Sequence, residues 1–111
     1  MTREPALETI RAAVEPLPGV EAGPGRFGSL RFALGRRELG HLHGDSIADL
    51  PLRHEDADRL IAAGQARPHQ YTPEGSGWVT IELDSDEDVE RTIELMRATY
   101  ERVTAKQSQA K

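Results

Sequence analysis

The sequence predicts an α+β fold, with an antiparallel sheet of about five strands, helices packed on one face, and a long helix at the C-terminal end. Two patterns lead to this prediction. Apolar residues recur every three or four positions near both ends of the chain, which is typical of amphipathic helices, and they alternate with polar residues in between, which is typical of half-buried strands. The short links between the expected strands favour an antiparallel meander.

The first expected helix covers 5–15 and ends where Pro16 and Pro18 interrupt the chain. Its buried stripe, at helical spacing, consists of Leu7, Ile10 and Val14. A strand starts at 20–22 and is cut short by Gly23-Pro24-Gly25. The next strand is expected over 27–34, where alternate residues are apolar.

A hairpin at Gly35-Arg36 should return the chain into a strand over 37–43, followed by a weaker strand over 46–52. A short helix is expected over 54–63, with Gly64 in the left-handed conformation just past its end.

In the last third of the chain, 66–71 is expected as an edge strand because it contains Pro68, and 72–77 as a turn. Residues 78–83 alternate as a clear strand. The long helix should then run from Ser85 to Val103, opened by a capping box between Ser85 and Asp88. Its buried stripe consists of Val89, Ile93, Met96, Tyr100 and Val103.

The 111 residues fit one domain, which we place at 1–104, followed by a disordered tail over 105–111. The net charge of −5 argues against a nucleic-acid partner, because such proteins present a basic face. No apolar run is long enough for a membrane span, and the first residues lack the apolar segment of a secretory signal, so we expect a cytoplasmic protein without membrane partners. The absence of cysteine excludes disulfides and thiolate chemistry.

The best functional lead is the pair of histidines within 40–45, Gly-His-Leu-His-Gly-Asp. Successive side chains of a strand point to opposite faces, so His41 and His43 should share the open face with Arg37 and Leu39. By the same alternation Glu38 should face the helices.

On the expected strand over 78–83, Trp78 falls on this open face as well, which would bring distant parts of the chain into one cluster. A face that carries these groups is suited to a small anionic or aromatic ligand. The candidate ligand-binding residues are Arg37, His41, His43, Asp45, His69 and Trp78. The alternative is a non-catalytic interaction domain, in which the sheet face or an edge strand binds a protein partner or forms a homodimer.

Two histidines on one strand are also a spacing used by imidazole metal sites, with His69, Asp45 or Asp49 as a third ligand. None of these stands at a recognisable ligand spacing, so we expect no stoichiometric metal. Asp45 or Asp49 beside His43 would form either an acid–base pair or a local hydrogen bond. No Gly-x-Ser-x-Gly elbow is present, and we assign neither a catalytic residue nor a cofactor.

Three stretches of the chain resemble the luciferase-like domain family, and the resemblance extends over 20–100. They are Arg-Glu-Leu-Gly-His-Leu-His-Gly-Asp at 37–45 with Ala-Asp-Leu-Pro-Leu at 48–52, the segment 63–69, and Gly-Ser-Gly-Trp-Val-Thr at 75–80 leading into Asp88-Val89. The layout is also similar to the YjbR-type proteins, which share a frataxin-like α+β arrangement. The resemblance implies a small bacterial α+β domain. Since most bacterial members have no assigned reaction, it implies no particular chemistry.

Overall fold

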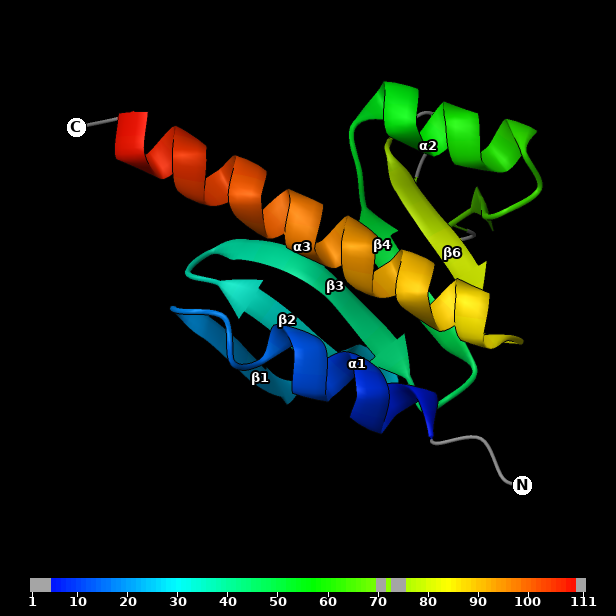
Figure 1. Ribbon diagram of the computed structural model, residues 1–111, viewed down its shortest axis with the longest axis horizontal. Helices are drawn as coiled ribbons and strands as arrows, with labels where there is room; N and C mark the ends of the chain where they lie inside the picture. Colours follow the sequence, from blue (N-terminus) through cyan, green and yellow to red (C-terminus); the bar gives the residue numbers. More distant parts are fainter. Residues whose placement is uncertain (1–4, 70–71, 73–75, 110–111) are drawn as a thin grey trace.

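The computed structural model describes residues 5–69, 72 and 76–109, and it shows a sheet with helices on one face (Figure 1). Helices α1 (Ala6–Val14) and α3 (Asp86–Gln109) lie across that face, and α2 (His54–Ala62) lies at one end of the sheet. This arrangement confirms the predicted α+β class and the long C-terminal helix. No helix in the described part of the chain combines the length and apolarity that a membrane crossing needs.

The sheet has six strands in the order β1-β2-β3-β4-β6-β5, one more than the estimate of about five. Every neighbouring pair is antiparallel. The strands are β1 (Val20–Pro24), β2 (Leu30–Leu34), β3 (Arg37–His43), β4 (Ile47–Pro51), β5 (Arg67–Pro68) and β6 (Trp78–Glu82). The first four form the expected meander. The chain then passes through α2 and β5 before β6 enters between β4 and β5.

The hydrophobic core lies between the sheet and the pair of helices α1 and α3. Its fully buried members from the sheet are Phe32, Leu39, Leu42, Ala48, Leu50, Val79 and Ile81, and those from the helices include Ile10, Val14 and Met96. The hydroxyl of Tyr100 donates a hydrogen bond to the carbonyl oxygen of Pro18 at 2.7 Å, which ties α3 to the chain just after α1. The opposite face of the sheet is covered by neither α1 nor α3.

A β-bulge interrupts the pairing of β2 with β3. Phe32 lies opposite Gly40 while the next residue, Ala33, lies opposite Glu38, so Leu39 is an extra residue on β3. Gly40 has a φ of +149°, a backbone conformation that residues other than glycine rarely adopt.

The bulge makes part of the predicted face assignment wrong. One extra residue reverses the alternation on its N-terminal side. Leu39 is fully buried in the core, although the sequence placed it on the open face. Glu38 lies on the open face instead, and Arg37 lines a separate depression together with Arg53, which precedes α2, and Arg102 of α3.

Several boundaries differ from the prediction. Strand β1 continues through Gly23 to Pro24, although the sequence predicted its end at residue 22. The segment Arg26–Gly28 forms a short 3-10 turn in which Phe27 has a positive φ of 56°, so β2 starts at Leu30. Helix α3 continues to Gln109 instead of ending at Val103, so the predicted tail is helical as far as that residue. No glycine or proline follows Gly77 to stop the helix. Residues 110–111, and 70–71 and 73–75 of the expected edge strand and turn, lie outside the described residues.

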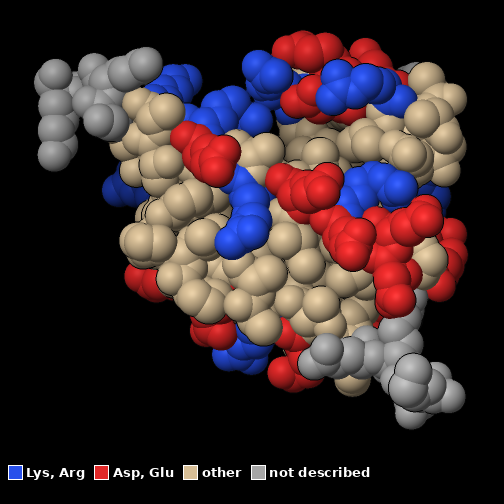
Figure 2. All heavy atoms as spheres, viewed as in Figure 1, with Lys and Arg blue, Asp and Glu red and all other residues tan. Residues whose placement is uncertain are grey.

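The predicted start of α3 is confirmed in detail. The Ser85 hydroxyl accepts the backbone N–H of Asp88 at 3.2 Å, and the Asp88 carboxylate accepts the backbone N–H of Ser85 at 3.0 Å. This reciprocal pair is a capping box. Figure 2 shows acidic side chains gathered over this end of α3, where Asp86 and Glu87 also lie in the first turn. Negative charge is favourable there because of the helix dipole.

Candidate functional site

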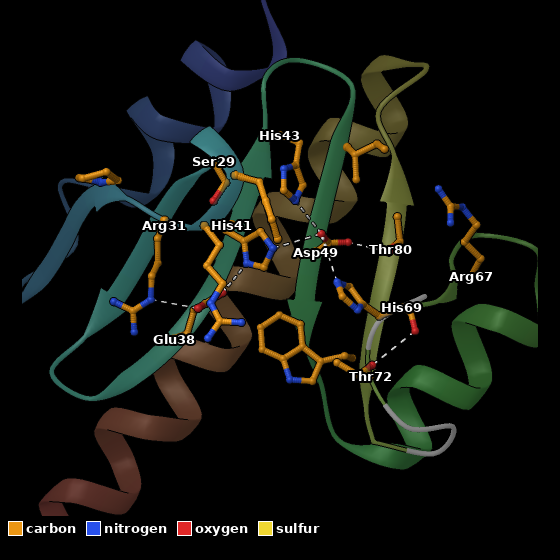
Figure 3. Close-up of a pocket in the computed structure, with 16 residues that line it drawn as sticks. Ser29, Arg31, Glu38, His41, His43, Asp49, Arg67, His69, Thr72 and Thr80 are labelled. Atoms are coloured by element: carbon orange, nitrogen blue, oxygen red, sulfur yellow. Dashed lines mark hydrogen bonds and ion pairs between the residues drawn. The ribbon is translucent and has the colours of Figure 1, made fainter.

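The open face of the sheet is hollowed (Figure 3). The hollow has a volume of about 940 Å³ and is lined by residues from all six strands, from the 3-10 turn and from the segment after β5. In this view α3 passes behind the strands, on the far side of the sheet.

The polar groups at the centre of the hollow follow one row of directly opposed residues across five strands. Arg31 of β2 lies opposite His41 of β3, His41 opposite Asp49 of β4, Asp49 opposite Thr80 of β6, and Thr80 opposite Arg67 of β5. Opposed residues on one face of a sheet lie within contact distance, so strand pairing alone assembles this row.

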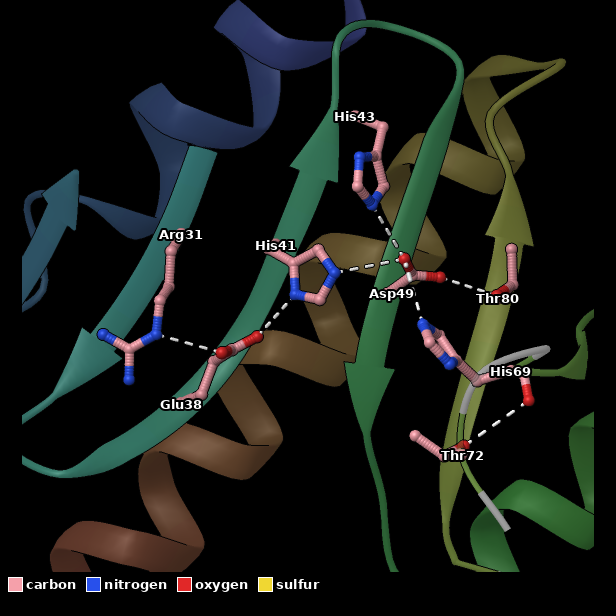
Figure 4. A network of polar contacts seen from close by, with 8 residues as sticks. All are labelled: Arg31, Glu38, His41, His43, Asp49, His69, Thr72 and Thr80. Atoms are coloured by element: carbon pink, nitrogen blue, oxygen red, sulfur yellow. Dashed lines mark hydrogen bonds and ion pairs between the residues drawn. The ribbon is translucent and has the colours of Figure 1, made fainter. Parts of the chain in front are cut away.

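Asp49 is the hub of the row (Figure 4). Its side chain is only 6% exposed, and its Oδ2 lies 3.1 Å from Nε2 of His41, 3.1 Å from Nε2 of His43 and 3.4 Å from Nε2 of His69. The hydroxyl of Thr80 donates to the other oxygen, Oδ1, at 2.6 Å. One carboxylate therefore meets three imidazoles and a hydroxyl.

His41 lies between two carboxylates. Besides its contact with Asp49, its Nδ1 lies 2.6 Å from Oε2 of Glu38, and Nε of Arg31 donates to Oε1 of that glutamate at 3.0 Å. The hydrogen bonds to Asp49 and to Glu38 raise the pKa of His41 to about 9. The ring is therefore an imidazolium at neutral pH.

Both carboxylates are ionised beside it. Burial by itself raises the pKa of Asp49, but the hydrogen bonds from His41 and Thr80 outweigh burial and lower it to about 2. Burial likewise acts to raise the pKa of Glu38, and the hydrogen bonds from His41 and Arg31 reverse that effect and lower it. The site is thus a compact network of alternating charges.

Aromatic rings form one wall of the hollow. The centroid of the Trp78 ring lies 5.7 Å from that of His41 and 5.8 Å from that of His69. His43 meets His41 edge to face at 5.1 Å. At the rim, Phe27 is 88% exposed, which is unusual for a large apolar side chain.

Four of the six residues that the sequence nominated line this hollow: His41, His43, His69 and Trp78. The other two do not. Arg37 is turned away by the bulge in β3, as described above. The carboxylate of Asp45 accepts the backbone N–H of Leu7 at 2.9 Å, so it holds the first turn of α1.

The sequence analysis did not identify Asp49 and Glu38 as central residues of the hollow. Asp49 was one of several optional partners, although a carboxylate inside an otherwise apolar strand is itself a signal for a functional site. Glu38 was placed on the wrong face. Gly40, a glycine inside a strand pattern, is the feature that indicates a bulge and would have corrected its position.

Comparison with known families adds one finding. The model of a family described as Luciferase domain matches residues 36–99, which is more than half of the chain and includes β3, β4 and β6. No curated protein matches the chain, and no solved structure matches it either.

Proposed function

The chain belongs to the Luciferase domain family, and we propose that it binds a small anionic aromatic molecule in the hollow on the open sheet face. One observation carries this proposal: the charged network around Asp49 forms the floor of that hollow, on the face that α1 and α3 leave uncovered. The volume of about 940 Å³ falls within the range of small-molecule sites.

A structural role is a weak explanation for the network. Taking charged groups out of water costs free energy, and a buried ion pair commonly gives no more stability than apolar residues of the same size. The imidazole of His41 is 20% exposed and the Asp49 side chain 6% exposed, so both are largely desolvated. Desolvated groups with shifted pKa values in a cleft are typical of binding and catalytic sites.

The walls indicate the chemistry of the ligand. Trp78 offers a flat ring surface, and Phe27 and Ile47 add apolar area at the periphery. Positive groups outnumber the negative ones along the walls although the whole chain carries a net charge of −5. The positive groups are Arg26, Arg31, Arg67 and His41, and the negative ones are Glu38 and Asp49. A planar molecule with a carboxylate or phenolate would match both features.

The single tryptophan allows a direct test. Because the chain contains one Trp, its indole N–H gives one resonance, and that resonance reports on the hollow. We expect 2-naphthoate, added in the presence of a chelator, to shift the Trp78 signal in a saturable way. The neutral analogue 2-naphthalenemethanol has the same rings and should bind more weakly.

Two arginine variants make a matched pair. Arg31→Ala should weaken 2-naphthoate binding about tenfold, since a hydrogen bond to a charged group contributes about 1.5 kcal/mol or more. Arg37→Ala removes the same charge from the other side of the bulge and should leave the affinity unchanged. An indole signal that does not move at millimolar 2-naphthoate, or that responds equally to the alcohol, would refute the proposal. Native mass spectrometry of the same samples reports the number of subunits, which tests the homodimer alternative.

A further inference from the structure

Three side chains that the sequence does not place at a recognisable metal spacing converge in the structure: His41, Asp49 and His69. One donor atom from each lies within 4.8 Å of the other two. We propose that these three residues bind one divalent first-row transition metal ion, such as Zn²⁺ or Fe²⁺. This inference shares the hollow with the proposed ligand but does not rest on it.

The spacing of the donor atoms fits such an ion. Metal–nitrogen and metal–oxygen bonds of about 2.0–2.1 Å in a tetrahedral site put neighbouring donors about 3.3 Å apart. Nε2 of His41 and Nε2 of His69 lie 3.1 Å and 3.4 Å from Oδ2 of Asp49. These two nitrogen–oxygen distances already match the spacing of neighbouring donors in such a site.

The crowding around Asp49 supports the same conclusion. A carboxylate oxygen has about two lone-pair positions, yet Oδ2 is approached by the Nε2 atoms of His41, His43 and His69. Three imidazoles cannot all donate well-directed hydrogen bonds to one oxygen. A cation among them turns this crowding into coordination. It displaces the proton that Nε2 of the metal-free His41 imidazolium carries, and neutral imidazole nitrogen and carboxylate oxygen are both good ligands for these metals.

The groups around the three ligands are placed to orient them. A metal-binding histidine usually donates its other ring N–H to a carboxylate, and Nδ1 of His41 lies 2.6 Å from Glu38, which Arg31 holds in turn. Thr80 donates to Oδ1 of Asp49 and so leaves Oδ2 directed at the imidazoles. Ligating carboxylates are commonly oriented by such a hydrogen bond.

The ligand count leaves the ion accessible. Two histidines and one carboxylate fill three positions, and the hollow beside them provides space for water or a small molecule at the others. Open sites of this kind belong to catalytic rather than structural metal centres. The prediction that the protein binds no metal was based on His41 and His43 as the first two ligands. The proposed set contains His69 in place of His43.

Calorimetric titration of the full chain with Zn²⁺ alone, after treatment with a chelator and its removal, tests the proposal. We expect one ion per chain with a dissociation constant in the micromolar range or tighter. His69→Ala and Asp49→Asn should each weaken binding more than tenfold. Thr80→Val keeps all three ligands but removes the orienting hydroxyl, and it should weaken binding by roughly 10–100-fold.

The histidine that does not line the hollow provides the control. His54 lies exposed at the start of α2, away from the hollow, so His54→Ala should bind Zn²⁺ as the unchanged chain does. Circular dichroism of each metal-free variant shows whether it is folded. If Asp49→Asn does not fold, the titration of His69→Ala tests the proposal. The absence of binding at submillimolar Zn²⁺, or binding that persists in folded His69→Ala, would overturn the proposal. Since no organic ligand is present, this result is independent of the 2-naphthoate titration.

Discussion

Replacing Gly40 by alanine tests the bulge on which the site depends. Gly40 has a φ of +149°, and an added Cβ would lie 2.5 Å from Cδ2 of Leu50 and 3.0 Å from the carbonyl oxygen of Asp49. The leucine methyl can shift, but the Asp49 carbonyl belongs to the backbone of β4 and cannot move without disturbing the strand pairing. The substitution therefore combines backbone strain with overpacking.

The expected loss follows from these two effects. An unfavourable backbone conformation costs about 1–3 kcal/mol, and an extra methyl group in a packed core costs about 1–3 kcal/mol. Gly40→Ala should therefore lower the free energy of unfolding by about 2–6 kcal/mol in a urea titration followed by circular dichroism.

Gly23 provides the matched control. It lies in β1 of the same sheet, has no positive φ, and has no atom within 4 Å of an added Cβ. Gly23→Ala should change the free energy of unfolding by no more than about 0.5 kcal/mol. If the two variants were equally stable, β3 would not need a glycine at its bulge, and the account of how Glu38 reaches the open face would be wrong.

Three further predictions concern the core, the cap and pH. Replacing the fully buried Met96 by alanine should cost about 2–5 kcal/mol of unfolding free energy in a urea titration. Ser85→Ala removes the hydroxyl that accepts the Asp88 N–H and should cost about 1 kcal/mol in the same assay. In the presence of a chelator, the free energy of unfolding should fall by about 2 kcal/mol between pH 7 and 9. The pKa of His41 is about 9 in the folded protein and 6.5 in the unfolded chain. In this pH range the folded state therefore holds a proton that the unfolded state has lost, and the stability due to that proton disappears as the pH approaches 9.

Each of these has its own control. Arg97→Ala, at an exposed position next to Met96, should leave stability within about 0.5 kcal/mol. Ser85→Thr retains a hydroxyl and should keep most of the capping free energy. His41→Gln should abolish most of the fall with pH. The groups that face this ring are Glu38, Asp49, His43, His69 and Trp78. An equal fall in the variant would assign the pH dependence to groups other than His41.

The elements of the fold could be predicted because their signals are local. The structure gives β3 the predicted bounds, 37–43, and ends α2 at Ala62, one residue before the expected end. The capping box at Ser85 needed only a spacing of three residues. The end of α3 was missed because a change to polar composition removes the buried stripe but does not stop a helix.

The candidate site was only partly predictable, because it depends on the register of β3 and on contacts between residues that are far apart in the sequence. Alternation located His41, His43 and Trp78 correctly, since each lies on the C-terminal side of the bulge or on a regular strand. It failed for Arg37 and Glu38, which precede the bulge. His69 follows a strand of two residues, and nothing in the local pattern shows that its imidazole reaches Asp49.

The bulge also sets the electrostatics of the site. With regular alternation, Arg37 would share the open face with His41 and Glu38 would be directed toward the helices. A guanidinium near the imidazole would then oppose its protonation, whereas the observed carboxylate favours it. The extra residue at Leu39 therefore exchanges a positive neighbour for a negative one. It gives His41 a second carboxylate on the side away from Asp49, and that pairing fixes the orientation of the ring toward the hub of the network. One glycine thus determines both how β3 packs on the core and what charge the hollow presents.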